Sequence, residues 1–84
     1  MNLQNEILLN KARLAEMKKR FQDMEDRAES YITIIREIID PYGGEFTELD
    51  MDKAIVMVVD FRILWVEARK LKGEIAKLEK SLGV

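Results

Sequence analysis

An apolar residue recurs at alternating spacings of four and three through most of the 84-residue chain, with one interruption near the middle. In the first part of the chain no glycine or proline breaks this heptad repeat, and ten of its eleven positions are apolar or aromatic. These positions are Leu3, Ile7, Asn10, Leu14, Met17, Phe21, Met24, Ala28, Tyr31, Ile35 and Ile38. A heptad sustained over this length predicts one long helix with a continuous apolar stripe.

A second heptad repeat follows a short stretch of turn-forming residues. The stretch Pro41-Tyr42-Gly43-Gly44 ends the first repeat, because proline disfavours a helical conformation in the residue before it. All nine positions of the second repeat are apolar: Ala54, Met57, Phe61, Leu64, Ala68, Leu71, Ile75, Leu78 and Leu82. We therefore predict a single domain (1–84) with helices over 3–39 and 48–82 and a turn over 40–47. Such a short connection folds the helices back antiparallel.

The start of the second helix carries a local signature. Thr47 fits the N-cap position, with Asp50 at the third helical position of a capping-box variant. Phe46 and Met51 occupy the two positions of a hydrophobic staple. The alternative for residues 54–59 is a strand, since β-branched residues favour sheets. The heptad runs through that segment unbroken and no second strand is available, so we favour the helix.

Charged residues at the g positions of the two repeats favour an antiparallel coiled-coil hairpin. In that arrangement g positions face each other, and three arginines of the first helix meet three acids of the second. The predicted ion pairs are Arg13 with Glu74, Arg20 with Glu67, and Arg27 with Asp60, and the numbers of each pair add to 87. A shift of one heptad still sets two of these arginines against acids, so the charges determine orientation better than register. Chance complementarity of two solvated faces is the alternative interpretation.

The half of the hairpin nearer the turn has more apolar residues than two helices can bury between them. A helix that is apolar nearly all round is normally buried on all sides, and a large exposed patch promotes aggregation. We therefore expect the all-α hairpin to self-associate, most simply as a two-fold homodimer that forms a four-helix bundle. Val56, an apolar residue of the second helix, also lies outside the heptad stripe, like the predicted interface residues. The predicted interface residues are Ile32, Ile34, Ile39, Ile55, Val58, Val59, Ile63, Trp65 and Val66.

Composition excludes several kinds of catalytic and metal-binding site. The chain has no cysteine and no histidine, which excludes disulfides, Cys/His metal sites and nucleophiles activated by histidine. The acids around the turn do not follow the EF-hand pattern, and no phosphate-binding glycine loop is present. Glu25, Asp26 and Glu29 suggest a magnesium site, but they lie outside the heptad stripe and should face water. We expect no enzyme activity, no cofactor and no bound metal.

Net charge and hydropathy indicate a partner that is a protein. The net charge of −2 does not favour general nucleic-acid binding, and acids dilute the densest basic cluster, residues 11–20. The longest apolar stretch, residues 54–66, is too short to span a bilayer. We expect a cytoplasmic protein without a membrane partner. Its predicted function is a non-enzymatic module for oligomerisation and protein–protein interaction with an unidentified partner. The alternative is a small assembly chaperone or structural subunit of a larger secretion or phage complex.

Overall fold

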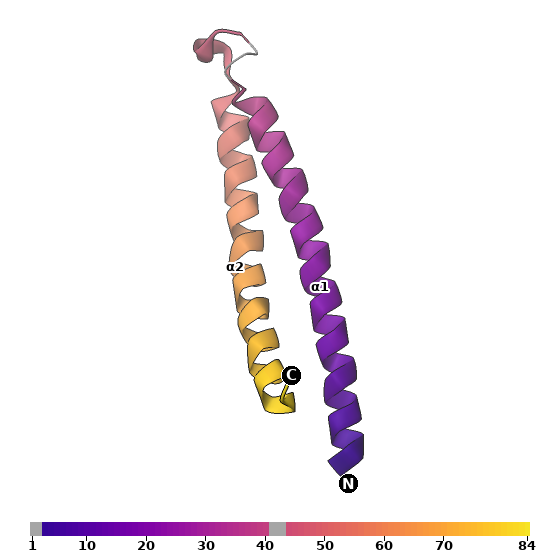
Figure 1. Ribbon diagram of the computed structural model, residues 1–84. Coiled ribbons are helices and arrows are strands. Elements are labelled where there is room, and N and C mark those ends of the chain that lie inside the picture. Colours follow the sequence, from indigo (N-terminus) through magenta and orange to yellow (C-terminus); the bar gives the residue numbers. More distant parts are fainter. Residues whose placement is uncertain (1–2, 41–43) are drawn as a thin grey trace.

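The chain forms an antiparallel helical hairpin in the computed structural model, which describes residues 3–40 and 44–84 (Figure 1). Helix α1 spans Leu3–Ile38, helix α2 spans Met51–Leu82, and the short 3-10 helix η1 spans Phe46–Glu48. The molecule measures 66 × 16 × 16 Å, and η1 lies beyond the turn-side ends of both helices (Figure 1). The prediction of an all-helical hairpin is therefore confirmed. The predicted turn residues 41–43 lie outside the described residues.

The heptad stripe of each helix faces the other helix. In the half away from the turn, Leu14, Met17, Leu71 and Ile75 form a buried cluster. Four half-buried residues pack against this cluster: Phe21, Met24, Leu78 and Leu82. In the half nearer the turn, the buried side chains among the described residues are Ala54 and Leu64. All of these residues belong to the predicted stripe, because burial of one apolar face against a neighbour is what stabilises an amphipathic helix.

A stack of two aromatic rings sets the register between the helices. The ring centroids of Tyr31 and Phe61 lie 5.6 Å apart and their planes are 7° apart. Both residues belong to the stripe, and their numbers add to 92. With this register the last residue of α2, Leu82, comes level with Asn10 of α1. Residues 3–9 consequently extend past the end of α2 (Figure 1), and Leu3 and Ile7 are exposed although the stripe includes them.

Helix α2 begins at Met51, three residues later than predicted. The N-cap is Asp50, whose side chain accepts a hydrogen bond from the backbone N–H of Lys53 at 3.0 Å. The prediction of a Thr47 cap is wrong, because Thr47 lies in η1 and aspartate is the stronger capping residue. The predicted staple is wrong as well, since Phe46 is 81% exposed and Met51 is also exposed.

From this start, α2 continues without interruption to its last turn. Residues 54–59, for which a strand was the alternative, are helical. The helix ends at Leu82, and the capping residue that follows, Gly83, adopts the left-handed conformation with φ 74°. The backbone N–H of Gly83 donates to the carbonyl of Lys80 at 3.3 Å, and that of Val84 donates to Glu79 at 3.0 Å. This pattern is a Schellman motif, which satisfies carbonyls that the helix end leaves unpaired.

Candidate self-association surface

Helix α2 presents an apolar surface away from α1 in the half nearer the turn. We call this surface the α2 patch, and it consists of Ile55, Val56, Val58, Val59, Ile63, Trp65 and Val66. The exposed fractions of these side chains lie between 46% and 58%. At 3.6 residues per turn they cover about half of the circumference of α2, on the side that the heptad stripe leaves free. Six of them were predicted as interface residues, and Val56 completes the surface.

The α2 patch continues onto one flank of α1. Lys18 and Glu79 form an ion pair at 3.3 Å across this flank, and their numbers add to 97. The numbers of Ile32 and Trp65 also add to 97, so these two residues lie across from each other on the same flank as Lys18 and Glu79. Ile32 and Ile39 are 38% and 44% exposed, so they extend the apolar surface at its edge.

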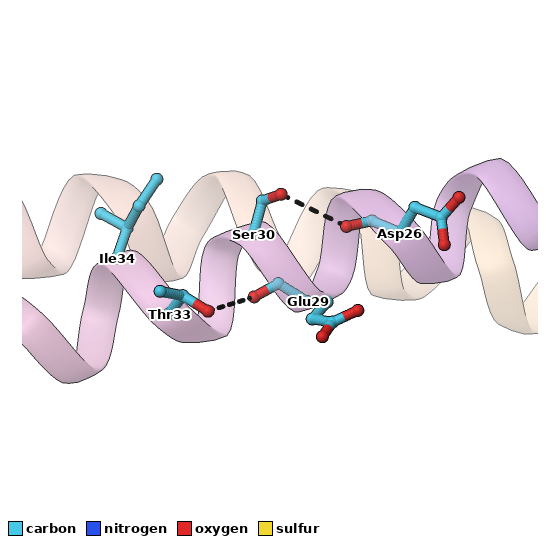
Figure 2. Close-up of a pocket in the computed structure, with 5 residues that line it drawn as sticks. All are labelled: Asp26, Glu29, Ser30, Thr33 and Ile34. Atoms are coloured by element: carbon cyan, nitrogen blue, oxygen red, sulfur yellow. Dashed lines mark hydrogen bonds between the residues drawn. The ribbon is translucent and has the colours of Figure 1, made fainter.

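The remaining predicted interface residue, Ile34, lies on the opposite flank. It is half-buried and lines a shallow hollow on α1 together with polar residues (Figure 2). The structure therefore does not bring Ile34 together with the α2 patch. The reason is its g position in the heptad, which turns the side chain away from the flank that holds Ile32.

The hollow beside Ile34 is polar and its groups are used locally. The hydroxyls of Ser30 and Thr33 donate to the backbone carbonyls of Asp26 and Glu29, at 3.3 and 3.0 Å (Figure 2). Such bonds tie each hydroxyl to the backbone of its own helix. The carboxylates of Asp26 and Glu29 point in different directions (Figure 2). Across residues 3–40 and 44–84, no three Asp or Glu side chains are placed to share a metal ion.

Charged residues mark the two ends of the α2 patch. Toward the open end of the hairpin, the guanidinium of Arg69 lies 4.7 Å from the centroid of the Trp65 ring, a cation–π contact. Arg62 lies within the patch and lines a small apolar hollow with Val58 and Trp65. At the turn end, Asp52 is exposed and lies on the same row of the helix as Val59, seven residues away. The patch therefore has the cation of Arg69 at one end, the carboxylate of Asp52 at the other, and Arg62 between them.

The predicted arginine–acid pairs lie on the flank opposite the Lys18–Glu79 pair. Arg13 and Glu74 line one shallow hollow, and Arg20, Glu67 and Glu74 line the next. The structure thus brings these two predicted pairs to the same side of the hairpin. None of the three pairs forms a direct ion pair, although all six residues are described. The ion pairs remain predictions.

Two charged contacts were not anticipated. The Lys18–Glu79 pair joins e positions, and the same heptad numbering that selected the g residues would have found it. The stacking of Arg69 on Trp65 follows from their spacing of four residues on an exposed helix face, which brings two such side chains together. In both cases the sequence signal was present.

Comparison with known proteins identifies no relative. No protein-family model, curated protein or solved structure matches the chain. Among the helices of the described chain, none has an apolar stretch long enough to cross a lipid bilayer.

Proposed function

We propose that the chain is a non-enzymatic oligomerisation and interaction module that binds a second copy of itself through the α2 patch. One observation carries the proposal. Seven apolar side chains, each about half exposed, lie around Arg62 on a helix whose opposite side is already packed against α1. A monomer of this size seldom leaves such a surface in water, and a surface of this kind marks a protein–protein contact.

The energetics support association. Full burial of a Val or Ile side chain contributes about 1.5–3 kcal/mol, so a residue that is half buried already has roughly 1 kcal/mol left to gain. Seven such residues on each of two copies contribute on the order of 10–20 kcal/mol. Association itself costs about 4–15 kcal/mol in lost freedom. A closed dimer, with four helices in contact, is the simplest assembly that meets this requirement.

A second candidate function is a structural subunit of a larger assembly. It is supported by a separate group of exposed apolar residues where α1 extends past α2. Leu3, Leu8 and Leu9 are 69%, 64% and 65% exposed there, at the opposite end of the hairpin from the α2 patch. With two different apolar surfaces, one surface of a chain can bind the other surface of the next chain. Such head-to-tail contacts produce filaments when they do not close into a ring.

Light scattering over a concentration series tests the first proposal. We expect a species of twice the chain mass of 9.8 kDa, and no further growth with concentration. The variant Val59→Lys plus Ile63→Lys should fall to the mass of one chain while circular dichroism still reports helix, because two lysines are then placed in the contact. The matched control is Ser30→Lys plus Thr33→Lys on the polar face of α1, which should keep the dimer.

Three results would contradict the proposal. The first is a single-chain mass at high micromolar concentration, and the second is equal dissociation of the α2 variant and its control. The third is open-ended growth that Leu8→Lys plus Leu9→Lys abolishes, which would favour the structural subunit instead.

A further inference from the structure

We propose that the open end of the hairpin binds the surface of an anionic lipid bilayer. In this arrangement residues 3–9 of α1 enter the headgroup region, basic residues behind them contact the lipid phosphates, and the turn points away from the bilayer. The contact is separate from the proposed self-association, because the α2 patch lies in the other half of the hairpin. It assigns the exposed leucines at the end of α1 to a lipid surface instead of to another subunit.

The end of α1 is apolar on several sides. Residues 3–9 extend past the last residue of α2 (Figure 1), and we call them the α1 overhang. Leu3, Ile7, Leu8 and Leu9 are 69%, 38%, 64% and 65% exposed there. At about 100° per residue, the side chains of residues 7, 8 and 9 spread over about 200° of the helix circumference, and Leu3 falls in the remaining arc. A single neighbouring helix covers one face of such a segment, whereas a headgroup layer surrounds an inserted helix on all sides.

Exposed basic residues surround the hairpin directly behind the α1 overhang. The stack of Tyr31 on Phe61 sets residues 10–20 of α1 beside residues 72–82 of α2. These two segments carry eight basic and three acidic residues, a net charge of +5, and we call the eight the basic collar. All eight are exposed: Lys11, Arg13, Lys18, Lys19, Arg20, Lys72, Lys77 and Lys80. Cations placed next to an inserted segment attract anionic lipid headgroups.

The remainder of the hairpin is acidic. Residues 21–71 carry six basic and twelve acidic residues, a net charge of −6, and the α1 overhang adds one acid, Glu6. The net charge of −2 is therefore the sum of two regions of opposite sign. An anionic surface attracts the basic collar and repels the acidic turn half, so it favours the approach with the open end first. Because screening limits this attraction to about 10 Å at 0.1 M salt, the collar nearest the surface dominates it.

A contact with the bilayer surface differs from a membrane span. The expectation of a chain without a membrane partner rested on the net charge and on the length of the longest apolar stretch. Neither quantity describes the open end, where exposed leucines and cations lie together. A peripheral contact needs an exposed apolar segment and adjacent cations, but no segment long enough to cross the bilayer. For the open end, the proposal replaces that expectation.

Sedimentation with lipid vesicles tests the proposal on the full chain. Vesicles of phosphatidylserine and phosphatidylcholine should bind at least about tenfold more tightly than vesicles of phosphatidylcholine alone, and the difference should shrink in high salt. Leu8→Gln plus Leu9→Gln should weaken binding at least about tenfold, because two apolar side chains no longer enter the headgroup region. The control is Phe46→Gln, which changes a side chain that is 81% exposed at the acidic end and should leave binding unchanged.

A second pair of variants tests the basic collar. Lys77→Gln plus Lys80→Gln should weaken binding to the anionic vesicles about 25-fold, or about fivefold for each lysine. The matched control is Arg27→Gln plus Arg36→Gln, which removes the same charge from exposed positions of the acidic half. It should change binding by no more than about twofold, because those positions lie farther than a Debye length from the surface. Equal effects of the two double variants would overturn the proposal.

Fluorescence quenching by brominated lipid chains tests the end-on orientation. Trp65 is the one tryptophan of the chain, and in the observed register it is level with residue 27 of α1, roughly 27 Å along the helix from residue 9. Leu9→Trp combined with Trp65→Phe should be quenched by the brominated vesicles, whereas the unmodified chain should not. Quenching of Trp65 as strong as quenching at position 9 would place the α2 patch against the bilayer and overturn the end-on contact.

Three other results would overturn the proposal. The first is no binding to the anionic vesicles, and the second is binding that Leu8→Gln plus Leu9→Gln leaves unchanged, as expected of a collar that binds any polyanion. The third is filament growth that the same leucine variant abolishes, which would assign the α1 overhang to another copy. The chain with Val59→Lys plus Ile63→Lys should still bind the vesicles, so loss of the dimer and loss of lipid binding are measured separately.

Discussion

Tyr31 of α1 and Phe61 of α2 stack with their ring centroids 5.6 Å apart and their planes 7° apart. The stack joins the two helices in the half nearer the turn, where the buried side chains Ala54 and Leu64 provide less apolar volume than the cluster around Leu71. An aromatic pair adds about 0.5–1.5 kcal/mol beyond the area that it buries. Because the two rings overlap in only one register, the pair also selects which heptads of the helices lie side by side.

The first prediction concerns the coupling between these two rings. Phe61→Ala should lower the free energy of unfolding by about 2–3 kcal/mol, less than a fully buried phenylalanine, since Phe61 is half-buried. A double-mutant cycle with Tyr31→Ala should return a coupling energy of about 0.5–1.5 kcal/mol, measured by urea denaturation at one fixed protein concentration. Tyr31→Phe is the control and should retain the coupling. Strict additivity of the two alanine variants would mean that the rings do not stack.

The second prediction compares one substitution at two sites. Leu71→Ala removes a side chain that is 4% exposed and should destabilise the hairpin by about 2–5 kcal/mol. Leu8→Ala changes a side chain that is 64% exposed and should shift the free energy by less than about 0.5 kcal/mol. Thermal unfolding followed by circular dichroism measures both. Equal effects at the two sites would place the core elsewhere.

The third prediction concerns the start of α2. Asp50→Ala should lower stability by about 1 kcal/mol, because the backbone N–H of Lys53 loses its acceptor. Thr47→Ala should have an effect within about 0.5 kcal/mol, since Thr47 lies in η1 and provides no cap. Asp50→Asn is a second control and should keep most of the stability. A larger loss from Thr47→Ala than from Asp50→Ala would restore the helix start expected from the sequence.

The fourth prediction concerns the ion pair between Lys18 and Glu79. The two side chains are 54% and 34% exposed, so their interaction is worth only about 0.2–1 kcal/mol. Lys18→Glu should destabilise the hairpin by a similar amount, and adding Glu79→Lys should restore it. The difference in unfolding free energy between the single and the double variant should shrink in high salt, because exposed charges are screened. If Glu79→Lys fails to rescue Lys18→Glu, the two residues are not neighbours.

Much of the fold could be predicted from the heptad repeats. Burial of Leu14, Met17, Leu71 and Ile75 follows from a period that matches the turn of a helix, and that match is a local property of the chain. The candidate site was likewise visible as apolar residues outside the stripe. Ile34 was the exception, because an apolar residue near the others in sequence need not share their flank. The predicted helix start failed because Thr47 and Asp50 are two capping residues three positions apart, and they differ by little in free energy.

The sequence by itself therefore determined two long helices, the face that each helix buries, and the charge pattern that favours antiparallel packing. The tertiary structure decided the register. A heptad repeat matches itself after every seven residues, so periodicity leaves several registers nearly equal in energy. The predicted arginine–acid pairs did not distinguish these registers, because a shift of one heptad still sets two of the arginines against acids. Contacts between specific side chains, such as the rings of Tyr31 and Phe61, are not periodic. Such contacts exist only when both helices are present, and they select one register from the set.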